Sequence, residues 1–100
     1  SIKERKNLSL NGYLEITLIL SNSGKLSKPV ISYRGIPENS FDEKIIFEME
    51  DEIFNTCRTF SMNNKNQEKN LIEMIKQNCR RLIKDKTGKK PFTNINIARL

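Results

Sequence analysis

The chain has 100 residues, 18 Lys and Arg against 12 Asp and Glu, a net charge of +6 and no histidine. One hundred residues suit a single domain with one modest core. The missing histidine removes the imidazole on which Ser-His-Asp triads, Cys-His pairs and most catalytic zinc sites depend. The composition therefore predicts a fragment that binds something or serves an enzyme, with no catalytic residue and no metal ligand of its own.

The first predicted elements are two strands joined by a turn. From residue 13 to 21 apolar side chains occupy every second position, which is the period of a half-buried strand. Residues 21–24, Ser-Asn-Ser-Gly, have the chemistry of a turn. A second strand is predicted from Pro29 to Ile36, where Pro29 stands first because it lacks the N–H that a strand ladder needs. The two strands are expected to form a hairpin.

Two amphipathic helices are predicted next. Pro37 ends the second strand, and Asn39 or Ser40 is expected to cap the first helix. Its apolar face recurs at spacings of three and four and comprises Phe41, Ile45, Met49, Ile53, Cys57 and Phe60. Residues 61–69 are expected to form a polar loop, with the second helix beginning near residues 67–70. The buried stripe of that helix comprises Leu71, Ile72, Ile75, Cys79, Leu82 and Ile83.

Gly88 and Pro91 predict the end of the second helix, and a last strand follows. In residues 93–99 the apolar pattern alternates again, with Ile95 and Ile97 facing inward. We predict an α+β two-layer sandwich in the order β-β-α-α-β, a three-stranded sheet covered on one face by two antiparallel helices. Either the first or the second strand can be central.

The charges divide into an acidic segment, residues 38–52, and a basic segment, residues 76–90. Phosphate contact needs only clustered positive charges, so the basic segment is the candidate RNA-binding site. Its candidate residues are Arg80, Arg81, Lys84, Lys86, Lys89 and Lys90. The alternative is a solvated face that offsets the acidic helix. The aromatic residues that usually alternate with basic ones in single-strand binders are missing from this segment.

The outer face of the sheet is the candidate interface with another protein surface. Its candidate residues are Tyr13, Ile19, Ile31, Tyr33 and Arg34, with either Ile31 or Val30 facing outward. An exposed apolar patch there would be covered by a second copy or by a neighbouring domain. Arg34 is alternatively expected to pair with a carboxylate of the acidic helix.

Two further residue groups have a structural interpretation. Cys57 and Cys79 fit reduced core positions of a cytoplasmic protein. Glu48, Glu50, Asp51 and Glu52 could hold Mg²⁺ only where Glu48 converges with Asp51 or Glu52, so a solvated helix face is favoured. No apolar run approaches the ~20 residues of a membrane helix, so no membrane partner is expected.

Three segments, in the same order, resemble the C-terminal domain of bacterial ribonuclease J. They are residues 5–12 (RKNLSLNG), which lead into an apolar strand, residues 29–38 (PVISYRGIPE), and residues 88–91 (GKKP) before the last strand. The second is similar to the family's Pro-x-Ile-Ser-x-Arg-Gly segment. Asn94 and Asn96 depart from the more apolar final strand expected for the family.

The resemblance implies an accessory domain of a metallo-β-lactamase/β-CASP ribonuclease. The parent would be a two-zinc enzyme that degrades RNA from the 5′ end and internally, with zinc in its catalytic domain and no cofactor in this fragment. Residues 1–9 would be the end of an interdomain linker and residues 10–100 the single domain. Expected partners are the catalytic domain of the same chain, further copies in a homo-oligomer, and RNA.

Two other hypotheses stay open from the sequence. The first is a free-standing basic RNA-binding module, which would bind RNA with a steep dependence on salt. The second is a small enzyme built on carboxylates and lysines, which lacks a pattern for an activated nucleophile.

Overall fold

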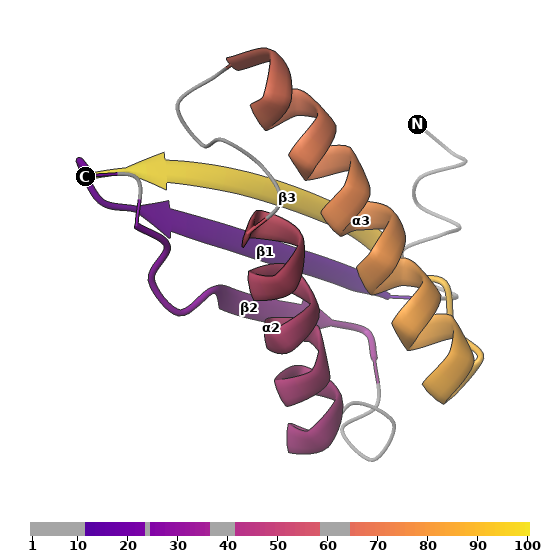
Figure 1. Ribbon diagram of the computed structural model, residues 1–100. Helices are drawn as coiled ribbons and strands as arrows, with labels where there is room; N and C mark the ends of the chain where they lie inside the picture. Colours follow the sequence, from indigo (N-terminus) through magenta and orange to yellow (C-terminus); the bar gives the residue numbers. More distant parts are fainter. Residues whose placement is uncertain (1–11, 24, 37–41, 59–64) are drawn as a thin grey trace.

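The computed structural model describes residues 12–23, 25–36, 42–58 and 65–100 (Figure 1). Along the chain it contains strand β1 (Tyr13–Leu20), strand β2 (Val30–Arg34), helix α2 (Glu43–Arg58), helix α3 (Lys65–Thr87) and strand β3 (Phe92–Arg99). The predicted order of elements and the α+β class are therefore confirmed.

The three strands form one mixed sheet in the order β2-β1-β3. β1 pairs antiparallel with β2, from Tyr13 opposite Arg34 to Thr17 opposite Val30. It pairs parallel with β3, from Tyr13 opposite Phe92 to Leu20 opposite Arg99. The first strand is thus the central one, which answers the question that the sequence left open, and the predicted hairpin is confirmed.

Both helices cover the same face of the sheet (Figure 1). On that face lie the apolar side chains of β1, of which Leu14, Ile16 and Leu18 are fully buried. Helix α2 contributes one buried stripe and α3 another, at spacings close to one helical turn. The buried apolar residues of the helices are Ile45, Met49, Ile53, Cys57, Leu71, Ile75, Cys79 and Ile83. Neither stripe could be buried by its own helix, so the helices and the sheet depend on each other for the core.

The two helices run antiparallel, as predicted. Asn78 Nδ2 of α3 donates to Thr56 Oγ1 of α2 at 3.3 Å. Lys86 Nζ of α3 lies 3.7 Å from a carboxylate oxygen of Glu48. Later residues of α3 thus meet earlier residues of α2, and Figure 1 shows the same opposed directions.

Two details of the helices differ from the prediction. Helix α3 begins at Lys65, so the last part of the predicted loop, residues 65–69, is helical. Glu68 lies in its first turn, where the helix dipole favours a negative charge, and it pairs with Arg99 of β3. The observed cap of α2 is Asp42, whose Oδ1 accepts the Ile45 N–H at 3.0 Å. The predicted caps Asn39 and Ser40 lie outside the described residues, as do Pro37, Phe41 and Phe60.

Candidate functional site

The outer face of the sheet, opposite the helices, presents every second residue of each strand. The register arranges these side chains in rows across β2, β1 and β3. The first row is Arg34, Tyr13 and Phe92. A polar row follows, with Ser32, Glu15 and Asn94, then a mixed row with Val30, Thr17 and Asn96, and the last row pairs Ile19 with Ala98.

We call the first row the aromatic–basic end. The rings of Tyr13 and Phe92 are stacked, with centroids 5.8 Å apart and planes 13° from parallel. Phe92 is 41% exposed, so the pair keeps ring surface open to solvent. Arg34 is exposed beside Tyr13. No carboxylate of the described residues pairs with Arg34, because α2 lies on the other face of the sheet. The predicted pair between Arg34 and a carboxylate of the acidic helix is therefore wrong for α2, residues 43–58, all of which are described.

We call the other end of this face the apolar end. Val30 is 52% exposed, Leu100 is 76% exposed, and Ala98 is exposed beside the half-buried Ile19. Between the two ends, Asn96 Nδ2 donates to Glu15 Oε1 at 2.8 Å. The face therefore changes from aromatic and basic, through polar, to apolar along the strands.

The five predicted interface residues divide between the two faces of the sheet. Tyr13, Ile19 and Arg34 lie on the outer face. Ile31 and Tyr33 lie on the inner face, where they pack against the core. Because side chains alternate along a strand, placing Ile31 inward places Val30 outward. The structure thus chooses Val30 from the two alternatives.

The predicted RNA-binding residues do not form one cluster. Arg80, Arg81, Lys84 and Lys90 line one shallow hollow of about 300 Å³. Lys86 points instead toward α2 and Glu48. Lys89 is half-buried beyond the end of α3, where its backbone N–H donates to Thr87 Oγ1 at 3.1 Å. Four of the six predicted cations therefore share a surface on which phosphates could be neutralised.

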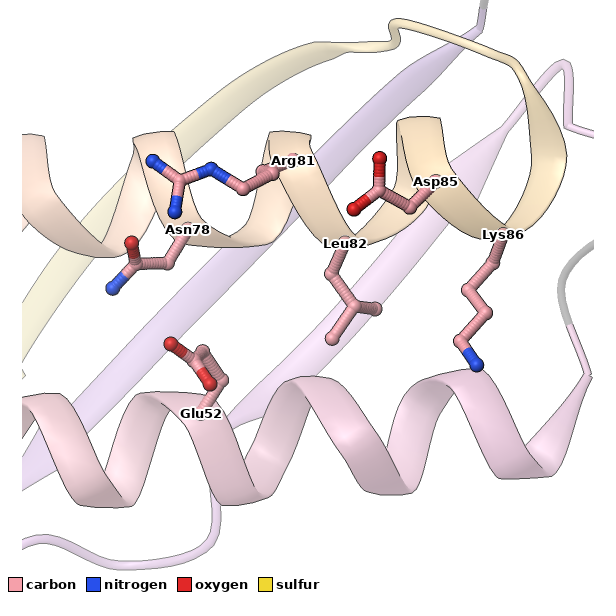
Figure 2. Close-up of a pocket in the computed structure, with 6 residues that line it drawn as sticks. All are labelled: Glu52, Asn78, Arg81, Leu82, Asp85 and Lys86. Atoms are coloured by element: carbon pink, nitrogen blue, oxygen red, sulfur yellow. The ribbon is translucent and has the colours of Figure 1, made fainter.

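A second hollow of about 300 Å³ lies between the helices (Figure 2). Figure 2 shows Glu52 directed from α2 toward α3, and Leu82 and Lys86 directed from α3 toward α2. Arg81 and Asp85 lie along its α3 side. Two carboxylates and two cations line this hollow, so it has no excess charge that would attract a phosphate or a cation.

The acidic residues of α2 do not converge on a metal site. No group of three or more His, Cys, Asp or Glu side chains suited to a metal ion occurs in the described part of the chain. The expectation of a solvated face is wrong for Glu50. Glu50 is only 9% exposed, on the β2 side of α2, with a carboxylate oxygen 3.9 Å from Lys28 Nζ. Glu48 and Glu52 lie instead on the side toward α3.

Both cysteines are buried free thiols, as their place on the apolar stripes predicted. Burial raises the pKa of the Cys57 thiol to about 11. Burial, with a smaller effect of the Glu52 charge, raises the pKa of the Cys79 thiol to about 12. A reactive cysteine needs a lowered pKa, so these thiols fill the core.

Sequence reasoning missed Phe92. The last strand was predicted from Thr93, although it begins one residue earlier, directly after Pro91. The alternation of Ile95 and Ile97 already places Phe92 on the outer face. Only the register, which the sequence does not contain, sets it beside Tyr13.

Among known protein families, the ribonuclease J C-terminal domain matches residues 1–100, the whole chain. The chain belongs to this family. The resemblance seen in the sequence segments is thereby confirmed, and a search of curated proteins found no match. As a ribonuclease J C-terminal domain, it is an accessory domain of an enzyme whose catalytic domain lies in the same polypeptide. Within the described residues, no helix is both long and apolar enough to cross a membrane.

Proposed function

We propose that this ribonuclease J C-terminal domain is a non-catalytic module that assembles and positions the catalytic domains of its parent enzyme. The observation that carries the proposal is the outer face of the sheet, which neither described helix covers (Figure 1). A sheet face with exposed apolar side chains is normally covered by a partner. The domain offers this surface while its own core is already closed on the other face.

The contact is proposed at the apolar end, around Val30, Ile19 and Ala98. The partner there is a second copy of the enzyme or its catalytic domain, since an interface core is apolar and poor in charge. In this proposal the catalytic domain of the parent supplies the zinc and the hydrolytic chemistry, and this chain, which has no histidine, supplies neither. The buried free thiols support a reducing cytoplasmic location.

The test is the mass of the intact enzyme, measured by light scattering, with Val30→Lys. A lysine placed in an apolar contact costs desolvation of its charge, so the assembly should dissociate or weaken at micromolar concentration. The matched control is Phe47→Lys, which changes an apolar residue that is 69% exposed on α2, in the helix layer. It should leave the mass unchanged. If Val30→Lys leaves both the mass and the RNA-degrading activity unchanged, this proposal fails.

A second candidate function is contact with RNA. It is supported by the hollow shared by Arg80, Arg81, Lys84 and Lys90, and by the net charge of +6. Clustered cations attract the RNA backbone without regard to sequence, and such binding weakens steeply with salt.

A further inference from the structure

Two aromatic rings from distant parts of the sequence meet at the aromatic–basic end of the sheet. Tyr13 begins β1 and Phe92 begins β3, and their rings are stacked with centroids 5.8 Å apart. Neither ring belongs to the core, because Leu14 and Thr93 are the residues that face the helices and are buried. A pair of near-parallel rings, of which Phe92 is exposed and Tyr13 half-buried, presents a surface to which another flat ring can add.

One positive charge lies beside this pair, and a second lies close to it in the sequence. Arg34 is the register partner of Tyr13 on one side. On the other side, Lys90 precedes Phe92 by two residues and lines the same hollow as Arg80 and Lys84. The chain therefore passes from the basic hollow of α3 to the ring pair within three residues, from Lys90 to Phe92.

The acidic residue of this face is turned away from the rings. Glu15 is the one carboxylate among the outer-face residues of the three described strands. Its Oε1 accepts a hydrogen bond from Asn96 Nδ2 at 2.8 Å, and Asn96 lies two rows from Phe92. The field around the rings therefore suits an anion that carries an aromatic group.

We propose that the aromatic–basic end binds single-stranded RNA, with a base against the Tyr13–Phe92 pair and the adjoining phosphates near Arg34 and Lys90. Every base has a flat π-face, so stacking on aromatic residues tolerates any sequence. A duplex keeps its bases stacked inside and cannot use such a surface. The inference deepens the second candidate function, contact with RNA, by adding a stacking surface to the basic hollow and by naming the strandedness of the RNA.

The test is fluorescence anisotropy of a labelled short single-stranded RNA with the 100-residue chain, whose five elements share one core, and then with the intact enzyme. Loss of base stacking lowers affinity by about 5- to 150-fold, which is the effect expected for Phe92→Ala. Phe92→Tyr keeps an aromatic ring and should bind like the unchanged protein. The matched control is Phe47→Ala, which removes an exposed phenylalanine from α2 and should not alter binding.

Salt separates stacking from charge. The loss caused by Phe92→Ala should be the same at low and high salt, whereas Arg34→Gln should reduce the slope of log affinity against log salt by about one unit. Duplex RNA should respond to Arg34→Gln but not to Phe92→Ala. Circular dichroism and thermal unfolding establish that each variant is folded.

The proposal is overturned if folded Phe92→Ala binds single-stranded RNA as tightly as the unchanged protein. It is equally overturned if this variant lowers the mass of the assembly and leaves RNA affinity unaltered, because the rings would then form a contact between copies. Failure of the assembly proposal is recognised separately, through Val30→Lys and the measured mass.

Discussion

Gly12 provides the sharpest test of how the aromatic–basic end is built. Gly12 is buried directly before β1, has φ of +86°, and its carbonyl accepts the Phe92 N–H at 3.0 Å. A Cβ at this position would lie 2.6 Å from Ile36 Cγ1 and 2.8 Å from the carbonyl oxygen of Arg34. The backbone oxygen cannot move without disturbing β2, so Gly12→Ala forces a shift in the strand that carries Arg34.

Gly88 is the matched control, because it shares the backbone conformation without the close contact. Its φ is +74°, its N–H donates to the Lys84 carbonyl at 2.8 Å at the end of α3, and a Cβ would meet no atom within 4 Å. Gly88→Ala should therefore lower the free energy of unfolding by only about 1 kcal/mol, because a residue with a Cβ is strained in the left-handed conformation. Gly12→Ala adds overpacking of about 1–3 kcal/mol, for a total of about 2–4 kcal/mol.

The assay is urea unfolding followed by far-UV circular dichroism, with thermal melts beside it. For a domain of this size, about 1 kcal/mol lowers the melting temperature by about 4–8 °C, so the two variants are easily resolved. Equal slopes against urea would establish that only stability has changed. If the two variants lose the same free energy within about 0.5 kcal/mol, the reasoning from the close contact at Gly12 is refuted.

Two further predictions concern α2 and the core. Asp42→Ala removes the oxygen that accepts the Ile45 N–H and should lower the free energy of unfolding by about 1 kcal/mol in urea titrations. Asp42→Asn keeps a capping oxygen and should be nearly neutral. Equal losses of free energy for both variants would contradict the capping role of Asp42. Cys79 has a pKa of about 12 in the folded chain and 9.0 as its ordinary value, so its protonated form is favoured by folding. Its contribution to stability is therefore complete below about pH 9 and falls by about 1.4 kcal/mol per pH unit above it, until the folded pKa is reached. The free energy of unfolding, measured from pH 8 to 10.5, should show this decline, and in Cys79→Ala it should depend less steeply on pH. If the slope of free energy against pH is the same in Cys79→Ala, Cys79 does not cause the decline.

The sequence predicted the fold well because hydrophobic period and local start and stop signals decide it. The apolar face of β1 and the apolar stripes of α2 and α3 are all buried together when both helices pack on the same face of the sheet. The helix start at Lys65 was not predicted, since residues 65–69 carry no apolar signal. Glu68 is held there by Arg99, a partner 31 positions away that a local pattern does not contain.

The candidate site was predicted less well, for a reason that is also physical. Composition identified the cations, and four of them do share a surface. The prediction grouped Lys86 with them, although its position on α3 directs its side chain toward α2 and Glu48. The aromatic pair was not found because strand pairing, rather than proximity in sequence, brings Tyr13 and Phe92 together. Long-range register is set by the whole core and is invisible to any window along the chain.

The two proposed surfaces do not compete for space, although they share one face of the sheet. A strand rises about 3.3 Å per residue, so Tyr13 and Ile19, six residues apart on β1, are separated by about 20 Å, and Arg34 and Val30, four apart on β2, by about 13 Å. The polar row of Ser32, Glu15 and Asn94 lies between the two ends. A partner whose contact is confined to the apolar end would therefore leave the rings and Arg34 open. An assembled enzyme could then hold single-stranded RNA on the same sheet by which its copies are joined.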